Sequence, residues 1–255
     1  MTGALRAICE AADAWSELGT EGVRTAGALF LRDVERADVW DANHARIGGA
    51  GEPDLAAFLE AAEALYAHCA HRAVRFDPRA RGGALEADLL RRGYQCELFL
   101  LMALEGPPHG MPGAARVADV ETEADWAAFA RLKQAEFDET GLALPGAAWG
   151  DHIRSKSPAT TWIASLDDEP VGLFSGYVHR DVAMLEDLFV LPAARRRGVA
   201  TTLVAHAVER AYRAGASLCF LSARADDTPK DMYARMGFKA VGVTRSLLRR
   251  GQTPS

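Results

Sequence analysis

Apolar positions recur with two different spacings in the second half of the chain, and each spacing predicts one kind of element. Apolar residues at every second position, or in a short continuous run, predict strands, and apolar residues every three or four positions predict amphipathic helices. Strands are expected at residues 116–120, 160–165, 171–179, 182–191, 218–222 and 238–248, the last as a strand or a hairpin. Helices are expected at residues 124–137, 199–213 and 230–236. Strands that alternate with helices in this way predict a mixed α/β (α+β) fold.

A segment rich in proline and glycine interrupts this pattern near the middle of the chain. Residues 105–113 contain three prolines and three glycines. Proline cannot donate a hydrogen bond to a sheet and glycine favours turns, so such a segment predicts a boundary. We therefore expect two domains, one at residues 1–108 and one at residues 114–255.

The first half of the chain repeats the pattern of the second half in a weaker form. Helical spacing covers residues 54–69, and strands are expected at 73–76 and 98–104. Before the last strand of each half, a short helix ends at a glycine and an aromatic residue, Gly93-Tyr94 and Gly237-Phe238, about 145 residues apart. This favours an internal duplication. The alternative is two unrelated α/β segments that share a glycine-capped helix end.

Composition places the chain among globular proteins. It has 255 residues, of which 49% are hydrophobic and 25% are charged, and these proportions are typical of soluble domains. The longest apolar run, residues 98–104, is far shorter than the ~18 residues that a bilayer requires. Glu10 and Asp13 interrupt the first apolar stretch, so a secretory signal is not expected.

The four cysteines form no CxxC pair and no disulfide framework, which is typical of free thiols in the cytoplasm. They are Cys9, Cys69, Cys96 and Cys219. His68, Cys69 and His71 lie close together in the sequence, but a zinc site takes its ligands from more than one segment. We therefore expect a cytoplasmic protein without a bound metal ion.

Charge is distributed unevenly along the chain. The formal net charge of −6 argues against a protein whose whole surface binds nucleic acid. Residues 191–255 carry 12 basic and 4 acidic side chains, whereas residues 111–190 carry 6 basic and 14 acidic ones. The first of these segments favours an anionic ligand, and the second favours a cationic one.

The strongest local feature of the basic segment is the run Arg195-Arg196-Arg197-Gly198-Val199-Ala200. It follows a predicted strand and opens a predicted helix, whose first N–H groups are unpaired and carry partial positive charge. Gly198 allows the backbone to approach a ligand closely, and the small Ala200 leaves the next turn open. The run predicts a cradle for a pyrophosphate. The alternative is a solvated basic turn before a helix.

Three motifs occur in a fixed order in the second half. They are Leu185-Glu186-Asp187-Leu188-Phe189-Val190-Leu191-Pro192, Arg195-x-x-Gly198-x-Ala200 and Tyr233-x-x-x-Gly237-Phe238. Together they resemble the GNAT superfamily of acetyl-CoA-dependent N-acetyltransferases, over roughly residues 114–250. The resemblance implies a GNAT-like acyltransferase fold in a tandem arrangement, with acetyl-CoA as co-substrate and a degenerate N-terminal half.

The resemblance assigns the cofactor contacts to the second half. Backbone groups of Leu188, Phe189 and Val190 would hold the pantetheine arm and polarise the thioester carbonyl at a bulge in the strand. The pyrophosphate would lie on a loop made of Arg195, Arg196, Arg197, Gly198, Val199, Ala200 and Thr201. Asp226 stands where the family commonly has an asparagine in contact with the cofactor. An ionised carboxylate accepts hydrogen bonds but donates none, so the chain departs from the family at Asp226.

Tyr233 and Glu186 are the expected catalytic residues. The resemblance assigns to Tyr233 the protonation of the departing thiolate, which suits a phenol that is neutral at pH 7; a plain core aromatic is the alternative. Deprotonating a primary amine at pH 7 costs about 4–5 kcal/mol, so a carboxylate base would help. Glu186 is the first choice because it lies on the strand beside the thioester position, with Asp187 facing the other side. The alternative for Glu186 is an ion pair with an arginine.

Glu136, Asp138 and Glu139 follow the first helix of the second half, where the family often shapes its acceptor pocket. They would attract a cationic substrate, or else they form a solvated helix end.

The first half lacks a counterpart of the arginine-rich loop, and Leu89 stands where Tyr233 does. Its expected role is therefore structural, or to wall the acceptor pocket through Trp40, Asn43 and His44.

The sequence thus predicts a cytoplasmic enzyme that moves an acetyl group from acetyl-CoA to a small-molecule amine, by direct attack in a ternary complex. Neither nucleic acid nor a membrane is an expected partner, and the acceptor's identity and the oligomeric state are left open. Two alternatives stand beside this prediction. One is a non-catalytic acyl-CoA-binding regulatory module, and the other is a protein or peptide acetyltransferase with the N-terminal half as docking domain.

Overall fold

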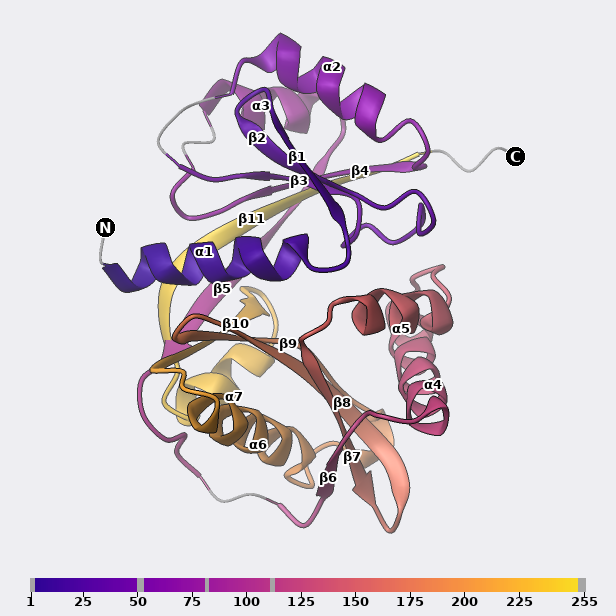
Figure 1. Cartoon of the computed structure of the whole chain (residues 1–255), viewed down its shortest axis with the longest axis vertical. Helices are drawn as coiled ribbons and strands as arrows, with labels where there is room; N and C mark the ends of the chain where they lie inside the picture. Colours follow the sequence, from indigo (N-terminus) through magenta and orange to yellow (C-terminus); the bar gives the residue numbers. More distant parts are fainter. Residues whose placement is uncertain (1–2, 50–52, 81–82, 111–112, 252–255) are drawn as a thin grey trace. The chain divides into compact units, whose positions relative to one another are not determined.

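The computed structural model describes residues 3–49, 53–80, 83–110 and 113–251. Its internal contacts divide the chain into two compact units (Figure 1). Unit 1 contains Met1–Leu101, Arg224–Asp226 and Gly242–Ser255, and unit 2 contains Met102–Ala223 and Asp227–Val241. Three strands, β5 (Gln95–Leu104), β10 (Leu218–Arg224) and β11 (Lys239–Arg250), have residues in both units.

Unit 2 is built on strands that lie in the order β6, β7, β8, β9 and β10. Their bounds are Arg116–Asp119, Thr160–Leu166, Glu169–His179, Val182–Val190 and Leu218–Arg224. Neighbours pair antiparallel from β6 to β9, whereas β9 and β10 are parallel. Asp167 and Asp168 form the β7–β8 turn at φ 51° and 65°, as a two-residue hairpin requires. The parallel pair needs a crossover, which α6 (Val199–Arg213) provides.

Helices cover both faces of this sheet. On one face lie α4 (Glu123–Thr140) and α5 (Gly146–Ser155), and on the other lie α6 and α7 (Pro229–Arg235), as Figure 1 shows. The start of α4 is fixed by a capping box. The Thr122 hydroxyl accepts a hydrogen bond from the N–H of Asp125, and the Asp125 carboxylate accepts one from the N–H of Thr122. Such caps satisfy N–H groups that the helix itself leaves unpaired.

Unit 1 contains the same type of parallel pair, among strands that lie in the order β1, β2, β3 and β4. Its strands β1, β2, β3 and β4 span Glu21–Thr25, Ala28–Arg32, His44–Ile47 and His71–Phe76. The β1–β2 and β2–β3 pairs are antiparallel, and β3–β4 is parallel. The crossover helix α2 (Leu55–Leu65) and α3 (Gly83–Arg91) lie on one face of the sheet, and α1 (Gly3–Glu17) lies on the other (Figure 1).

Aromatic side chains form the centre of the unit 1 core. Phe30 of β2 packs against Phe58 of α2 and against Tyr66, with ring centroids 5.4 and 5.9 Å apart. All three are essentially buried, together with Phe76 of β4. Each such side chain contributes about 1.5–3 kcal/mol through burial, so α2 is fixed against the sheet by this cluster.

The last strand of the chain completes the sheet of unit 1. Residues 245–250 of β11 pair antiparallel with residues 71–76 of β4, and Leu247 is fully buried in the unit 1 core. The predicted domains, 1–108 and 114–255, therefore differ from the compact units at the C-terminal end. An apolar pattern shows which face of a strand is buried, but not which strand it pairs with. The domain limits themselves stay a prediction.

The two units share one order of elements. In each, two parallel strands are joined by a helix, and a short helix follows the second strand. Each short helix ends before a glycine of positive φ, Gly93 at 84° and Gly237 at 100°, and then a buried aromatic residue. The predicted mixed α/β fold and its duplication are confirmed by this repeated topology.

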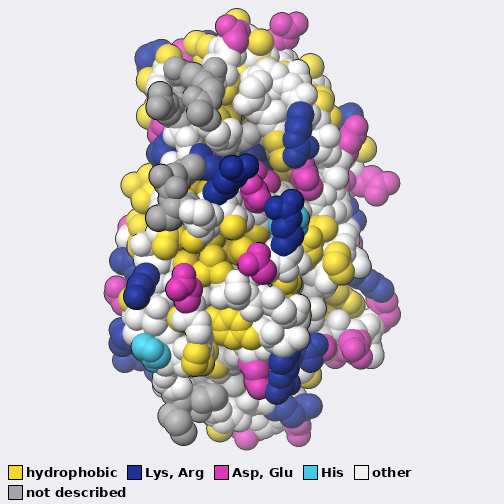
Figure 2. Space-filling model, turned by 60° about the vertical axis from the view of Figure 1, so that its left-hand side comes forward, with side chains coloured by type: hydrophobic (Ala, Val, Ile, Leu, Met, Phe, Trp, Pro, Cys, Tyr) yellow, Lys and Arg dark blue, Asp and Glu magenta, His cyan; other side chains and the backbone are white. Residues whose placement is uncertain are grey.

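Acidic and basic side chains are interspersed on the face shown in Figure 2. Many exposed charges of the protein form ion pairs, such as Arg6 with Glu10 on α1 and Arg213 with Glu209 on α6. Exposed pairs contribute little to stability, because water screens them. Charges that are buried carry more information about function, since burying them is costly.

Candidate active site

Strand β9 carries an extra residue where it pairs with β8. Leu173 pairs with Phe189, but Ser175 pairs with Glu186, so β9 advances three residues while β8 advances two. Asp187 lies in this bulge at φ 67°, in the left-handed region that few residues other than glycine adopt. A bulge bends its strand and redirects side chains, and such features are frequent near active sites. The bulge expected from the resemblance is present at this position.

The parallel strands β9 and β10 lose their pairing at the same place. Their register runs from Val182 and Leu218 to Leu185 and Leu221, although both strands continue further. Beyond Leu185, β9 pairs with β8 on its other side. A strand edge that is not paired offers N–H and C=O groups to an extended ligand. The predicted pantetheine contacts, Leu188, Phe189 and Val190, lie on this part of β9.

The loop before α6 requires its glycine. Gly198 is the N-cap of α6 at φ 79°, and a Cβ there would come within 3.0 Å of the Cα of Gly113. Because glycine has no side chain, none caps the helix, and its first N–H groups, those of Val199, Ala200 and Thr201, have no partner within the helix. Arg196 and Arg197, just before them, are exposed. A helix N-terminus beside two guanidinium groups suits an anionic group.

The side chain of Arg195 is engaged elsewhere in unit 2. Its Nη1 and Nη2 donate to the carboxylate of Glu139 at 2.8 and 2.6 Å, and its Nε donates to the carbonyl of Val190 at 3.0 Å. The hydrogen bond from Arg195 lowers the pKa of Glu139. Arg195 therefore links the end of α4 to the end of β9. Any cofactor contact at Arg195 is then expected from its backbone rather than from its guanidinium group.

Tyr233 of α7 is buried, with 5% of its surface exposed, and packs edge-on against Phe238 with ring centroids 5.9 Å apart. Burial raises the pKa of its hydroxyl, and the negative charges of Glu186 and Asp227 raise it further. Tyr233 is therefore protonated at neutral pH, as a proton donor must be. Because the charge of Glu186 acts on Tyr233, the fold brings the two predicted catalytic residues into one neighbourhood.

A buried charged cluster, which was not predicted from the sequence, lies at the bulge. Lys133 of α4 is 2% exposed, and its Nζ lies 2.6 Å from Asp187 Oδ1 and 2.6 Å from Glu136 Oε2. Trp149 of α5 donates from Nε1 to the other oxygen of Asp187 at 2.9 Å. The Lys133 Nζ also lies 4.8 Å from the ring centroid of Trp149 and 5.0 Å from that of Phe137. One cation facing two carboxylates leaves this cluster with a formal charge of −1.

The cluster holds charge against the effect of burial. Burial acts to lower the pKa of Lys133, but the charges of Asp187 and Glu136 outweigh it and the pKa is raised. Burial raises the pKa of Glu136, against the attraction of Lys133 and with a further contribution from Asp187. Titratable groups whose pKa is shifted by burial and by a charged partner are frequent at sites that transfer protons or bind charged ligands.

Helical spacing is the sequence signal that could have revealed Lys133. It lies four residues after Phe129 and four residues before Phe137, both buried, so it belongs to the apolar stripe of α4. A lysine in such a stripe needs a buried partner. Asp187, in turn, faces α4 and α5, as strand alternation predicts for the neighbour of Glu186.

The remaining predicted residues have other contacts. Asp138 is exposed on α4 and accepts a hydrogen bond from Gln134. Asp226 groups with unit 1, where both of its oxygens accept hydrogen bonds from Arg224 at 3.2 Å. A cofactor contact at Asp226 stays a prediction.

Trp40, Asn43 and His44, named above as wall residues, belong to unit 1. Trp40 is half-buried, and Asn43 and His44 are fully buried. The side chain of Asn43 accepts a hydrogen bond from the N–H of Asp33 and donates to the carbonyls of Arg36 and Val39. This pattern is typical of a residue that fixes a loop.

Two further features concern the described residues as a whole. None of their helices combines the length and the apolar character that crossing a membrane requires. Among the same residues, no three His, Cys, Asp or Glu side chains gather closely enough to hold a metal ion.

Unit 2 thus combines a mixed sheet, a bulged strand that leaves its parallel partner, and a crossover helix that starts at a glycine. Residues 125–238 match the family model described as "Acetyltransferase (GNAT) family". Residues 125–238 thus resemble a GNAT acetyltransferase domain. No protein of curated function matches the sequence.

Solved structures resemble the chain over most of its length. A GCN5-related N-acetyltransferase from Kribbella flavida has a TM-score of 0.69 at 19% identity, covering 98% of this chain and 97% of its own. A functionally unknown conserved protein from Staphylococcus epidermidis has a TM-score of 0.69 at 15% identity, covering 92% and 95%. A tandem GNAT protein from the clavulanic acid biosynthesis pathway has a TM-score of 0.55 at 14% identity, covering 78% and 70%. These likenesses establish a GNAT fold, with a tandem protein among the neighbours.

Proposed function

We propose that this protein is an N-acetyltransferase that moves the acetyl group of acetyl-CoA to a small-molecule amine, by direct attack in a ternary complex. The observation that carries the proposal is the bulge at Asp187, where β9 loses its pairing with β10 beside Tyr233 and Glu186. The resemblance of residues 125–238 to a GNAT domain supports the same reaction class.

The residues present fit acetyl-CoA as co-substrate. The edge of β9 at Leu188, Phe189 and Val190 offers backbone groups to the amides of a pantetheine arm. The glycine-started helix α6, with Arg196 and Arg197 exposed before it, suits a pyrophosphate. When bound there, the co-substrate supplies an activated acetyl group as a thioester.

The protein groups have separate tasks in this proposal. Glu186 accepts the proton that the attacking amine must lose, directly or through a water. The amine nitrogen then forms an amide bond to the acetyl carbon while the carbon–sulfur bond breaks. Tyr233 holds the proton that the leaving sulfur needs, because its raised pKa keeps the hydroxyl protonated at neutral pH.

The Lys133–Asp187–Glu136 cluster supports a cationic acceptor. It lies on the side of the bulge that faces α4 and α5, and it has a formal charge of −1. Glu136 is the outermost member, since its side chain is 28% exposed while those of Lys133 and Asp187 are 2% and 9% exposed. Glu136 is therefore the carboxylate that a cationic substrate would meet first.

The experiment that tests the reaction is the substitution Tyr233→Phe. It removes the hydroxyl and keeps the ring that packs on Phe238, so the turnover number should fall while the Kd for acetyl-CoA is unchanged. Tyr177→Phe, a tyrosine of β8 outside the proposed site, should behave as the wild type. Unchanged turnover of Tyr233→Phe at several pH values would remove Tyr233 from the mechanism.

The acceptor proposal is tested by Glu136→Gln. Loss of the negative charge should raise KM for a diamine more than it lowers kcat, because the charge acts in binding the substrate. Asp138→Asn, a change of an exposed carboxylate on the same helix, is the matched control. Equal effects of the two substitutions would contradict a specific role for Glu136.

Two alternatives predict other outcomes. A non-catalytic acyl-CoA-binding module would bind acetyl-CoA and release no thiol with any amine. A protein acetyltransferase would modify peptides and leave small amines untouched.

We also propose the cytoplasm as the compartment, because Cys9, Cys69, Cys96 and Cys219 are free thiols in the fold.

A further inference from the structure

Unit 1 contains a cavity of about 500 Å³ with charged walls. Its lining comes from α1, from the β1–β2 hairpin, from the end of β3 and from the segment after β4. Pockets of roughly 300–1,000 Å³ are typical of small-molecule sites. The proposed acetyl transfer uses residues of β9, α4, α6 and α7, and it gives this cavity no role.

The charged side chains in the lining are Asp13, Arg24, Arg46 and Arg79. Three guanidinium groups and one carboxylate line the wall, and the carboxylates of Asp77 and Glu17 pair with Arg79 and Arg24. Guanidinium groups bind carboxylates and phosphates through two parallel hydrogen bonds, which makes arginine the common residue for recognising these groups. The chemistry of the wall therefore favours an anionic ligand.

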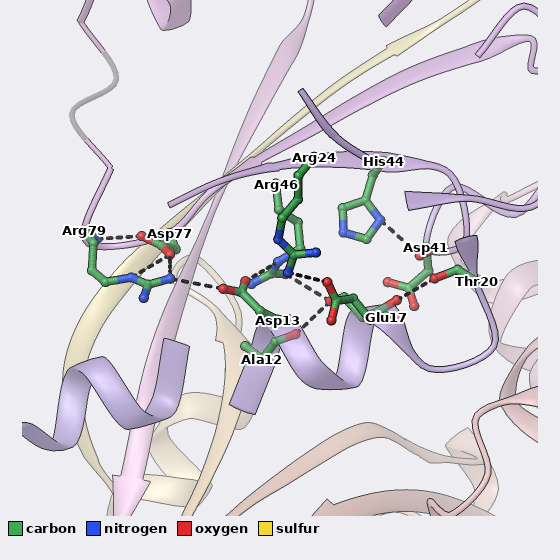
Figure 3. A network of polar contacts seen from close by, with 11 residues as sticks. Ala12, Asp13, Glu17, Thr20, Arg24, Asp41, His44, Arg46, Asp77 and Arg79 are labelled. Atoms are coloured by element: carbon green, nitrogen blue, oxygen red, sulfur yellow. Dashed lines mark hydrogen bonds and ion pairs between the residues drawn. The ribbon is translucent and has the colours of Figure 1, made fainter. Parts of the chain in front are cut away.

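Asp13 holds two of these arginines side by side (Figure 3). Its Oδ1 accepts a hydrogen bond from Arg46 Nε at 2.8 Å, and its Oδ2 accepts one from Arg79 Nη2 at 3.2 Å. Arg79 Nε also donates to Asp77 at 2.9 Å, and Arg46 Nη1 donates to Ser16 at 3.1 Å. The side chains of Arg46 and Arg79 are 10% and 14% exposed. Both guanidinium groups are thus fixed in place before any ligand arrives.

Each guanidinium group keeps donors that this network does not use. Arginine has five N–H donors in a planar fork. Within the part of the chain that the structure describes, Arg46 Nη2 and Arg79 Nη1 make no hydrogen bond. Arg24 donates to Glu17 through Nη2 alone, and 66% of its side chain is exposed. A ligand would meet two fixed guanidinium groups and a third, more exposed one (Figure 3).

The backbone around the cavity is shaped for close approach. The hairpin turns at Ala26 and Gly27, with φ of 48° and 74°. A Cβ on Gly48 would come 2.8 Å from Arg79 Nη2 and closer still to Asp77. A side chain at this position would therefore displace the ion pair between Asp77 and Arg79. The positions of Arg79 and of the backbone beside it therefore depend on each other.

A network that served only to attach α1 to the sheet would not need an open space among its charges. Ile8, Ala11 and Trp15 of α1 are buried as well, so apolar packing already holds this helix in place. Apolar packing stabilises as well as buried ion pairs do, and often better. Three arginines around a cavity are better explained by a ligand than by stability.

We propose that the cavity of unit 1 binds a small organic dianion, whose carboxylate or phosphate groups lie on the free donors of Arg46 and Arg79 and on Arg24. A ligand with two anionic groups meets the fixed donors of Arg46 and Arg79 with one group and the exposed Arg24 with the other. The first half is then a binding unit of its own, which goes beyond the structural role expected for it from the sequence. This proposal is independent of the acetyl transfer proposed for unit 2.

The test is isothermal titration calorimetry on the full chain with succinate, glycerol phosphate and acetate as probes. One of the two dianions should bind, and more tightly than acetate; the better of the two identifies the group that the arginines recognise. Arg24→Gln should weaken its binding about tenfold, the effect of losing one charge-assisted hydrogen bond. Arg24 is mostly exposed, so this variant is expected to fold.

Two control variants make the result specific. Arg6→Gln removes an exposed arginine of α1 that pairs with Glu10 and does not line the cavity, and it should leave binding unchanged. Arg196→Gln reports on the loop before α6, the other place where an anion is expected, and it should also leave binding unchanged. Binding that is lost in Arg196→Gln and kept in Arg24→Gln would overturn the proposal, as would the absence of binding by both dianions.

Discussion

Replacing Lys133 with methionine removes the cation of the buried cluster and keeps most of the side-chain volume. Asp187 and Glu136 would then face each other without a partner charge, and Asp187 would keep only the Trp149 N–H, 2.9 Å away. Removing one partner of a buried pair costs about 3–5 kcal/mol. Because Glu136 is partly exposed and can gain water, we expect the free energy of unfolding to fall by about 3 kcal/mol at neutral pH, near the lower end of this range.

The size of this loss should depend on pH. Without Lys133 the pKa of Glu136, which burial already raises, rises further, because the attraction of the lysine is lost. A carboxyl group whose pKa is raised by folding favours the folded state at low pH and loses that contribution as pH rises through the folded pKa. The difference between wild type and variant should therefore be widest at neutral pH and should narrow as the pH falls towards ~4–5.

Urea denaturation followed by tryptophan fluorescence measures both quantities. The double variant Lys133→Met/Asp187→Asn should recover part of the loss, since it removes one of the two unpaired charges. Arg154→Met breaks an exposed pair with Glu123 and serves as control, with almost no change in the free energy of unfolding. A loss for Lys133→Met below about 1 kcal/mol, or one that does not change with pH, would refute a buried charged cluster.

Three further predictions follow from single positions. Gly198→Ala should cost about 1–2 kcal/mol, because φ is 79° and Gly113 lies against it, and it should weaken acetyl-CoA binding in a thermal shift titration; an unchanged Kd would contradict the role of this loop. Leu247→Ala should cost about 2–5 kcal/mol and speed hydrogen exchange in β4, since Leu247 is fully buried in unit 1; unchanged exchange in β4 would contradict this placement. Because the pKa of Tyr233 is raised, the rate should show no alkaline decline due to this residue up to about pH 10; a decline near pH 9 that Tyr233→Phe abolishes would argue against a buried, protonated hydroxyl.

The elements of the second half could be predicted closely, because each has a clear spacing or turn signal. The predicted helix at 199–213 coincides with α6, and the hairpin turn at Asp167-Asp168 lies between the strands predicted at 160–165 and 171–179. Helix α5 was not predicted. Its buried residues Trp149 and Ile153 are separated by Gly150 and polar side chains, so the helical spacing is short and interrupted.

The first half was harder to predict for a physical reason. Strand β1 is almost entirely exposed, so it shows no alternation of apolar and polar positions, and α1 and β1–β3 were missed. The pairing of β11 with β4 could not be predicted from the sequence either. The apolar pattern of a strand shows which of its faces is buried, but not which strand it pairs with.

The site could be predicted only in part. The motifs led to the bulge, the glycine before α6 and the buried tyrosine, which are local features of single segments. The Lys133–Asp187 pair and the contact of Arg195 with Glu139 join positions 54 and 56 residues apart. Such pairs depend on how segments pack, and they show that the guanidinium group of Arg195 links two elements, while a cofactor contact at Arg195 stays a prediction.

The most direct test of the proposed acetyl transfer is to measure amine-dependent release of thiol from acetyl-CoA by the wild-type protein. The assay follows free thiol with a chromogenic disulfide and identifies the acetylated amine by mass spectrometry. Thiol release is expected only when an amine is present, with one acetamide formed per thiol and with cationic amines as the better acceptors. Acetyl-CoA that raises the Tm of the protein, while no amine or peptide gives thiol release, would contradict the proposed acetyl transfer.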